Sequence, residues 1–461
     1  MKYIYSVLAM ASVLLFVVSC KKDVPPHGGT TRHSVLTLEE DKSEKLFEDT
    51  FCDVEFIPLE NKRECMIGNC VKVVIEGNHI YLWDMNGTDA LLSFNMDGSF
   101  HKKIGEKGHS KHEYTYVKNF SVNRGGDTIA LLDYNVLKYY DADGKYIGSE
   151  ETGYSWDNML YSTKGIVLGS HYRGFGRETL LQIRDPYSGR VKDVLPVDST
   201  HISYPPYSVN TIQQVGDTVC FFDFIESTFY LYNVNNPDDV ESIQLQTDNV
   251  LDEKRARKGI SSDRLDNDEV EKFVYAGSEI MGLMLIGGQS TSFKIDVKKK
   301  RAYRFNFRNG FCEFDCYHDG YFYSVMPSGW LLDECEYSRT KGEVYKKALE
   351  IVNNGLSEKD NDVVMRCRLK KMGKMTAHVM IRGGRMWGIV LLALAFSFLF
   401  ACCSCRLNDD VKRMYSMKVN MPYCKMDKRR CSIYAKNRGG STLVLLSYIE
   451  EKTAAHVRSH D

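Results

Sequence analysis

Residues Val71 to Gly108, VKVVIEGNHIYLWDMNGTDALLSFNMDGSFHKKIGEKG, are soon followed by a second stretch of the same design, Val117 to Gly153, VKNFSVNRGGDTIALLDYNVLKYYDADGKYIGSEETG. In each, a β-rich run ends in Asp, a second run follows, and an Asp-Gly pair precedes a last run that begins with an aromatic residue. The Asp residues are Asp84 and Asp133, and the pairs are Asp97-Gly98 and Asp143-Gly144. A period of about 40 to 50 residues built from four short strands indicates the blade of a β-propeller.

Four further copies of this pattern follow. They cover Trp156 to Val197, Asn210 to Thr247, Phe273 to Gly310 and a last stretch that begins at Phe314. The last copy is incomplete, but Phe51 to Leu59 and Asn361 to Lys370 both read as strands. Their pairing would close the ring and hide edges that would otherwise be open to aggregation. We therefore predict an all-β fold, a six-bladed β-propeller of four-stranded antiparallel blades over residues 46–371.

Two stretches interrupt the repeat. Leu251 to Lys272 is dense in charged residues and is predicted to be a solvated helix or loop, although degenerate strands in it would make a seventh blade. Glu343 to Asn353 is predicted to form a short helical insert, because apolar residues recur on one helical face. They are Val344, Ala348, Ile351 and Val352.

The first 20 residues have the plan of a secretory signal peptide. Lys2 precedes an apolar run from Ile4 to Val18, which is short for a membrane span. The ending Val17-Val18-Ser19-Cys20 resembles a bacterial lipobox, whose Cys becomes the lipidated first residue of the mature protein. Ordinary cleavage and a retained anchor are the alternatives. We predict a lipoprotein signal peptide at 1–20, lipid attachment at Cys20, a flexible tether at 21–45, and a location at the outer membrane or periplasmic face.

A second apolar run of 19 residues, Trp387 to Cys405, lies beyond the repeat and is long enough to be a transmembrane candidate. Basic residues lead into it, and a span after an exported propeller would place them against the positive-inside tendency. We favour residues 372–405 as the signal-like start of another lipoprotein fused to the reading frame. A genuine anchor and a buried helix are the alternatives. Residues 406–461 are predicted to be a poorly ordered extension.

Composition and motifs narrow the function classes. A net charge of -1 gives no global attraction to nucleic acid, so no such partner is expected. The chain has no HExxH, GxSxG or phosphate-loop motif, and we assign no catalytic residue, cofactor or metal. An exported setting permits a disulfide between Cys52 and Cys367, which lie on the two strands proposed to close the ring. Buried free thiols are the favoured interpretation.

The geometry of a blade directs attention to one face. The loop after the second strand and the connection to the next blade open on that face, and ligands tend to bind where loops converge. The candidate ligand-binding residues in or beside such loops are His171, Arg173, Asp223, Glu226 and Trp330. Asp84 and Asp133 lie there too, and we interpret them as braces of their own turns. The loop that carries His171 and Arg173 is also rich in glycine, which suits a long hairpin.

The stretch FIPLE…IGNCVKVVIEGNHIYLWD…LLSFNMDGSFHKKIGEKGHSKHEY resembles the six-bladed β-propeller lipoproteins, relatives of the NHL-type propellers. That family typically has a GxGPGEY loop after its first blade. Here Gly108 to Tyr114 reads GHSKHEY, which keeps the Gly and the Glu-Tyr and lacks the Pro-Gly. The resemblance covers roughly Phe51 to Lys370 and implies a fold and an envelope location, with no reaction.

Two function classes remain open. The favoured one is a membrane-anchored binding module whose rim presents polar and aromatic groups to a glycan, a peptide or a protein. The alternative is a propeller hydrolase or lyase of the lactonase kind, which would need metal ligands converging on the central channel.

Overall fold

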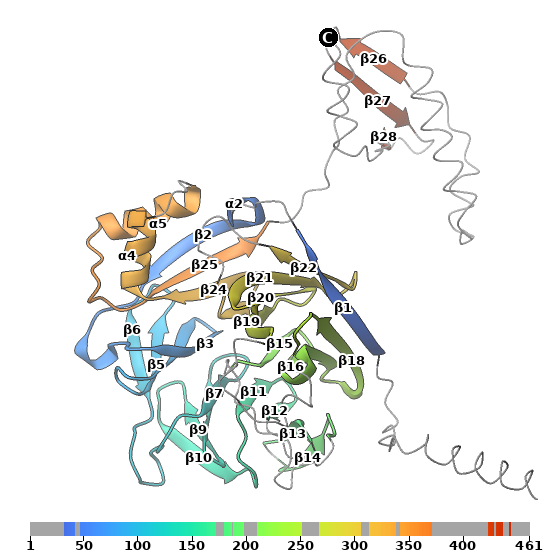
Figure 1. Cartoon of the computed structure of the whole chain (residues 1–461). Coiled ribbons are helices and arrows are strands. Elements are labelled where there is room, and N and C mark those ends of the chain that lie inside the picture. Colours follow the sequence, from blue (N-terminus) through green and yellow to red (C-terminus); the bar gives the residue numbers. More distant parts are fainter. Residues whose placement is uncertain are drawn as a thin grey trace, which may run out of the picture. The chain divides into compact units, whose positions relative to one another are not determined.

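The computed structural model divides the chain into two compact units, Met1–Lys370 and Lys371–Asp461, each considered by itself (Figure 1). The residues that it describes are 32–41, 47–171, 179–186, 188–197, 210–250, 267–305, 313–337, 342–370, 423–427, 430–436 and 442–443.

Three sheets of the first unit are simple antiparallel meanders of four strands, which pair in chain order. Sheet 1 holds β3 (Cys70–Glu76), β4 (His79–Asp84), β5 (Leu91–Asn95) and β6 (Phe100–Ile104). Sheet 2 holds β7 (Asn119–Val122), β8 (Thr128–Asp133), β9 (Val136–Asp141) and β10 (Tyr146–Glu151). Sheet 3 holds β11 (Asn158–Ser162), β12 (Gly165–Gly169), β13 (Leu181–Arg184) and β14 (Val191–Asp193). The repeat predicted from the first two stretches is therefore confirmed. Its Asp-Gly turns place Gly98 and Gly144 at φ of +86° and +77°, which suits glycine.

A nine-stranded sheet follows, in which one parallel strand joins two antiparallel meanders. The first meander holds β15 (Ile212–Val215), β16 (Thr218–Asp223), β17 (Thr228–Asn233) and β18 (Asn236–Gln246). The second holds β19 (Glu269–Tyr275), β20 (Glu279–Ile286), β21 (Gln289–Asp296) and β22 (Arg301–Phe305). The joining strand is β1 (Arg32–Glu40), which pairs with β18 through Arg32 to Thr37 and with β22 through Leu38 to Glu40.

Strand β1 corrects the prediction of a flexible tether over residues 21–45 at residues 32–40, and residues 21–31 and 42–45 lie outside the described residues. Its backbone completes hydrogen bonding on the outer edges of β18 and β22, and Leu36 is buried against the core between the two meanders. The charged stretch after β18 is also corrected at one end, because Glu269 to Lys272 belong to β19. The rest of that stretch, residues 251–266, lies outside the described residues.

The closing sheet combines the two ends of the first unit. It contains β23 (Cys316–His318), β24 (Tyr321–Met326), β25 (Val363–Leu369) and β2 (Phe51–Pro58). Strand β2 is antiparallel to β25, with Phe56 opposite Met365, so the predicted closure is confirmed. Helix α2 (Phe47–Thr50) precedes β2. Cys52 and Cys367 are free thiols, as favoured from the sequence.

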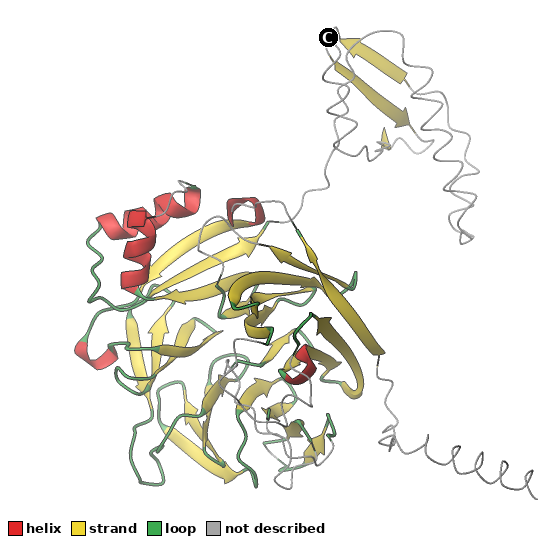
Figure 2. Ribbon diagram, viewed as in Figure 1, coloured by secondary structure: helices red, strands yellow, loops and turns green. Residues whose placement is uncertain are grey.

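Two helices are inserted between β24 and β25, as Figure 2 shows in red. Helix α5 (Glu343–Asn353) has the predicted bounds and buries Val344 and Ala348. Helix α4 (Ser328–Tyr337) was not predicted; its buried residues Ser328, Leu331 and Cys335 are spaced by three and four positions. Gly329 weakens the helical signal at its start.

The apolar core lies between neighbouring sheets. First strands contact one another in sequence, β3 with β7, β7 with β11, β11 with β15, β15 with β19, β19 with β23 and β23 with β3. Figure 1 shows the sheets arranged around this common centre. One core cluster combines Tyr81 and Trp83 of sheet 1 with Phe120 and Leu131 of sheet 2. The first unit is thus an all-β, propeller-like body.

A buried amine ties three first strands together near the centre. Lys72 of β3 donates from Nζ to Asn119 Oδ1 and to Phe120 O of β7, both at 2.8 Å. It also lies 3.5 Å from Met159 O of β11. Burial lowers the pKa of Lys72 to about 7. The Lys72 amine is therefore surrounded by three uncharged acceptors, and its burial away from water disfavours its charged form.

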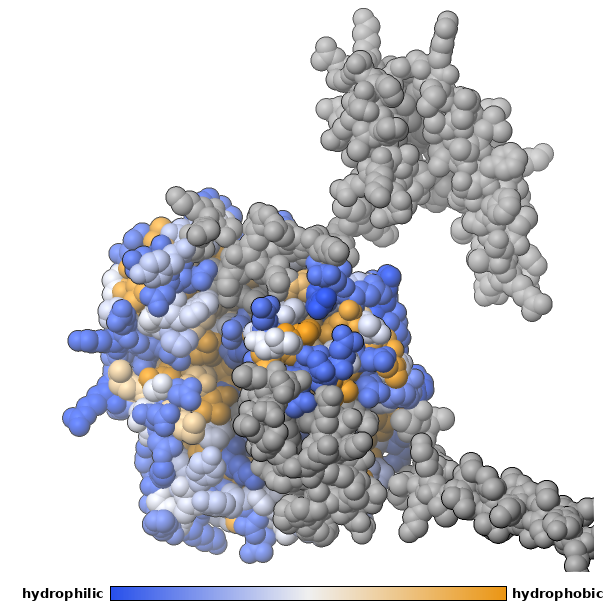
Figure 3. All heavy atoms as spheres, in the orientation of Figure 1, coloured by the Kyte–Doolittle hydropathy of each residue, from blue (hydrophilic) through white to orange (hydrophobic). Residues whose placement is uncertain are grey.

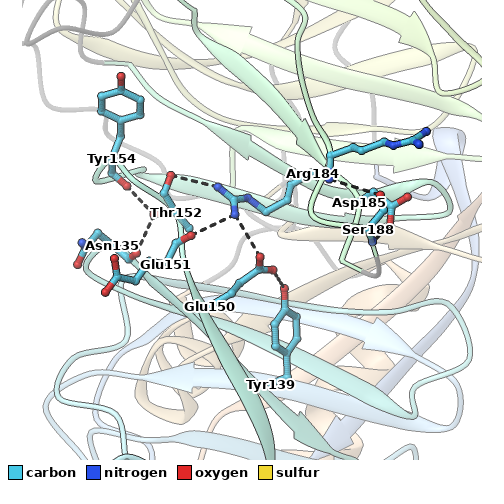
Figure 4. Close-up of polar contacts among 10 residues, drawn as sticks. Asn135, Tyr139, Glu150, Glu151, Thr152, Tyr154, Arg184, Asp185 and Ser188 are labelled. Carbon is cyan, nitrogen blue, oxygen red and sulfur yellow. Dashed lines mark hydrogen bonds and ion pairs between the residues drawn. The ribbon is translucent and has the colours of Figure 1, made fainter.

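Further out, an arginine links sheets 2 and 3 (Figure 4). Arg184 of β13 donates to Glu150 Oε2 and to the carbonyl oxygens of Glu151 and Thr152, at 3.1 to 3.2 Å. Glu150 also accepts a hydrogen bond from Tyr139 OH. The Arg184 guanidinium thereby joins β10, the outer strand of sheet 2, to β13, the third strand of sheet 3.

In the second unit, β26 (Tyr423–Asp427), β27 (Arg430–Lys436) and β28 (Thr442–Leu443) form a three-stranded sheet. The extension predicted to be poorly ordered therefore contains strands. Within the described part of the chain, no helix has the length and apolar character needed to cross a membrane. Trp387 to Cys405 lies outside that part.

A chain truncated after Ser357 tests ring closure. It lacks β25, so β2 and β24 lose their shared partner and the core loses Val363, Met365 and Cys367. We expect a lower melting temperature with reduced cooperativity, measured by circular dichroism. Truncation after Lys371, which retains β25, is the matched control. Unfolding of the Ser357 truncation that stays cooperative at the control's melting temperature would contradict closure.

Candidate binding surface

His171 follows β12 and is buried, with only 2% of its surface exposed. Its Nε2 lies 3.2 Å from Asn158 Nδ2 and 3.0 Å from Thr211 Oγ1. Its ring stacks on Phe221 with a centroid distance of 5.5 Å. Burial lowers the pKa of His171 to about 4, so the ring is neutral at physiological pH. This side chain packs between sheet 3 and the nine-stranded sheet, which corrects the expectation that it is open at the rim.

The other four predicted residues differ in their settings. Asp223 ends β16 and is buried, and its Oδ1 accepts from the backbone N–H of Ile225 at 3.2 Å. Glu226 belongs to the short 3-10 helix η2 (Ile225–Ser227). The side chain of Glu226 and the whole of Arg173 lie outside the described residues. Trp330 is exposed on α4. The structure thus brings His171 and Asp223 to one junction and places Trp330 in the insertion of the closing sheet.

Asp84 braces the loop at the end of the second strand of sheet 1. Its Oδ1 accepts from the backbone N–H groups of Gly68 and Asn69 at 2.7 and 3.0 Å. Its Oδ2 accepts from Thr88 Oγ1 at 2.9 Å. The loop can approach this closely because Gly87 has no side chain, and a Cβ there would lie 2.6 Å from Asp84 Oδ2. One buried carboxylate thereby fixes both the loop and the segment that enters β3.

Asp133 holds the segment that enters sheet 2. Its carboxylate accepts from the backbone N–H groups of Thr115 and Tyr116 at 3.0 and 3.1 Å and from Thr115 Oγ1 at 2.6 Å. Lys138 Nζ lies 3.4 Å from Oδ2. The prediction that each Asp braces its own turn is confirmed for Asp84, whereas Asp133 bonds to Thr115 and Tyr116 and not to its own hairpin turn. Both also hold the connection from the preceding sheet, which the repeat alone did not indicate.

Three tyrosines stand exposed around the loop that Asp133 fixes, and we call them the tyrosine face. Tyr116, Tyr134 and Tyr154 expose 41%, 59% and 44% of their surface. The rings of Tyr116 and Tyr134 have centroids 5.9 Å apart and planes tilted by 40°. Trp83 is buried beneath them and meets Tyr116 edge-on, at 6.3 Å and 88°. A rigid support therefore underlies an exposed aromatic pair.

Tyr154 is joined to the same turn through Thr152. The hydroxyl of Thr152 donates to Asn135 O at 2.8 Å and to Tyr154 O at 2.6 Å. Figure 4 shows Asn135 and Tyr154 on either side of Thr152, with the Tyr154 ring pointing away from the Arg184 network.

Tyr134 has an unusual backbone conformation. Asp133 pairs with Val136, so Tyr134 and Asn135 form a two-residue hairpin loop. Tyr134 has φ of +55°, a left-handed value that favours glycine at the first position of such a turn. Strain of this kind persists where the surrounding structure imposes it, and it is frequent at functional sites.

Two lysines on the segments around the tyrosine face have acidic partners. Lys107 contacts Asp89, and Lys118 Nζ lies 3.0 Å from Asp157 Oδ1. Lys118 also donates to Ser155 Oγ at 2.9 Å. Among the residues that the structure describes, no group of three or more His, Cys, Asp or Glu side chains could hold a metal ion.

The view of the first unit in Figure 3 shows hydrophobic residues interspersed with hydrophilic ones. The tyrosine face itself was missed from the sequence, because 28 Tyr residues made single tyrosines uninformative. Tyr134 nevertheless follows the repeated Asp directly, which is the signal that could have placed it in a tight turn.

These features define an all-β, propeller-like protein with an exposed aromatic surface beside the loops of two sheets. The chain belongs to the family described as Domain of unknown function (DUF4934), whose model matches residues 33–368. A comparison with curated proteins found no match.

A comparison with solved structures found several that are similar to this chain. A presumed exported protein from Bacteroides fragilis has a TM-score of 0.61 at 17% identity, over 73% of this chain and 100% of that chain. A member of the DUF4221 family from Bacteroides vulgatus has a TM-score of 0.43 at 8% identity, over 69% of this chain and 97% of that one. The β-propeller domain of Cps50 (Swd1) from Myceliophteria thermophila has a TM-score of 0.30 at 9% identity, over 52% of this chain and 72% of that one. The first of these likenesses shows the fold, and the other two carry no further conclusion.

The left-handed turn gives a stability test. Tyr134→Gly and Tyr134→Ala both remove the ring and its contact with Tyr116, and they differ only in the Cβ at a positive φ. We expect the Gly variant to be more stable than the Ala variant by about 1 kcal/mol, because the Cβ is strained there. Urea unfolding of the two variants measures the difference. An Ala variant as stable as the Gly variant would mean that this turn is not left-handed.

Proposed function

We propose that this protein is an envelope-anchored binding module, a six-bladed NHL-like propeller lipoprotein whose tyrosine face recognises a glycan, a peptide or a protein. The observation that carries the proposal is the exposure of the contacting rings of Tyr116 and Tyr134, with the backbone of Tyr116 held by the buried carboxylate of Asp133. A surface held in its binding conformation loses little conformational entropy on association.

The count of six rests on treating the nine-stranded sheet as two blades joined by β1. Each of its meanders has four antiparallel strands, like sheets 1 to 3 and the closing sheet. The contacts between first strands also run through both meanders before they return to β3. Strand β1 then joins the outer strands of two blades, β18 and β22, by pairing with both.

An envelope location is supported by the signal-like N-terminus and by the B. fragilis neighbour, which is itself described as a presumed exported protein. Lipid attachment at Cys20 would leave residues 21–31 between the anchor and β1. At roughly 3.3–3.6 Å per residue, such a segment spans at most about 40 Å. The propeller would therefore remain close to the membrane that holds the lipid.

Cys20→Ala tests the anchor. Metabolic labelling with a fatty-acid analogue in a bacterial host should mark the unsubstituted protein and leave the variant unmarked, because the thioether-forming sulfur is lost. The variant should also leave the membrane fraction. Labelling that persists in the variant would place the lipid elsewhere, with Cys402 as the next position to test.

Substitution of the tyrosine face tests binding. Ligands of the full-length protein, solubilised in detergent, can be screened with glycans and peptides by thermal shift, since binding to the native state raises the melting temperature. For any such ligand, Tyr116→Ala and Tyr134→Gly should each weaken binding about tenfold or more, as expected for aromatic contacts that become buried on binding and contribute about 1.4 kcal/mol or more.

Tyr337→Ala is the matched control, because Tyr337 is 72% exposed but lies on α4. Trp330→Ala reports on the alternative rim residue predicted from the sequence. A ligand whose affinity falls with Trp330→Ala and is unchanged by both tyrosine substitutions would move the site to α4 and overturn the assignment.

A further inference from the structure

We propose that the ligand of the tyrosine face is a neutral carbohydrate, an inference that rests on the binding function proposed above. The first argument is size. Three half-exposed tyrosine side chains present far less area than the roughly 800 Å² that each partner contributes to a standard protein interface. The patch is suited to a few sugar rings.

Among the residues that the structure describes, the exposed aliphatic side chains do not extend this area. Val35 and Val191 belong to β1 and β14. Ile147 lies at the far end of β10 from the Tyr134 turn, since Glu151 at the near end pairs with Val136. An apolar peptide or protein surface would therefore find aromatic rings here without the surrounding aliphatic surface that a larger interface uses.

The second argument is charge. Three lysines on the segments around the face, Lys107, Lys118 and Lys138, lie against Asp89, Asp157 and Asp133 respectively. A charged ligand is recognised by an opposite charge that is free to pair with it. Because these charges are already paired, the face favours an uncharged ligand.

The third argument is the chemistry of the rings. No described residue forms a hydrogen bond with the hydroxyl of Tyr116, Tyr134 or Tyr154. Each ring therefore offers an apolar face together with a donor and acceptor at its edge. A neutral sugar has the matching combination, with C–H groups on the faces of its ring and hydroxyls around its edge. The 40° tilt between Tyr116 and Tyr134 allows the two rings to contact successive units of a twisted chain.

Affinity electrophoresis of the full-length protein in detergent tests this proposal. The gels contain the neutral polysaccharides dextran, soluble starch, yeast mannan or xyloglucan, or the acidic polygalacturonate. At least one neutral polysaccharide should retard the protein. Tyr116→Ala and Tyr134→Gly should each raise the apparent dissociation constant about tenfold or more. Tyr134→Phe, which keeps the ring, should stay within about threefold, and Tyr337→Ala should have no effect.

The outcomes separate the ligand class from the site. Binding at the tyrosine face that is limited to polygalacturonate or to peptides overturns the carbohydrate proposal and leaves the binding function standing. If a neutral polysaccharide retards the protein and neither tyrosine substitution changes the apparent dissociation constant, the assignment of the site to the tyrosine face is wrong. If none of the neutral polysaccharides retards the protein, the proposal is wrong. A melting curve for each variant shows that a loss of retardation is not a loss of folding.

Discussion

The pairing of β2 with β25 is the constraint on which the rest of the first unit depends. It joins Glu55 to Arg366 across 311 residues of chain, through a hydrogen bond of 2.7 Å. Without it, the closing sheet would have three strands, and the core between that sheet and sheet 1 would lose Ile57 of β2. Every other sheet is held by its neighbours on both sides, so its position also depends on this closure. The pairing also covers the edge of β25, which would otherwise be open to other chains.

Within the closed body, buried polar groups position the loops. Asp84 satisfies backbone N–H groups in two segments at once, Asp133 satisfies those of the segment that enters sheet 2, and Lys72 satisfies acceptors from two other sheets. Such groups are expensive to bury unless they are hydrogen-bonded. Because they are bonded here, they specify the register between sheets, which apolar contacts alone would leave loose. The tyrosine face inherits its rigidity from one of them, since the carboxylate of Asp133 holds the backbone of Tyr116.

The sequence predicted those parts of the fold that repeat or alternate. The Asp-Gly turns, the paired closing strands and α5 each have a local signal that the surrounding structure reinforces. Strand β1 has no such signal, because RHSVLTLEE is mostly exposed and takes its conformation from the edges of β18 and β22. His171 shows the limit for sites. Its position after β12 was predicted, but its burial depends on Phe221 and Thr211, which belong to the next sheet.

The placement of β1 has a consequence for the order of folding. Synthesis delivers β1 and β2 first, yet β1 pairs with residues about 200 and 260 positions later, and β2 must wait for the end of the first unit. Both N-terminal strands therefore have no pairing partner while the meanders form from local contacts. Their late docking converts a set of separately formed sheets into one cooperative body, and contacts of such long sequence separation are slow to form. The interval in which β2 has no partner is the period when the nascent chain is most open to misassociation.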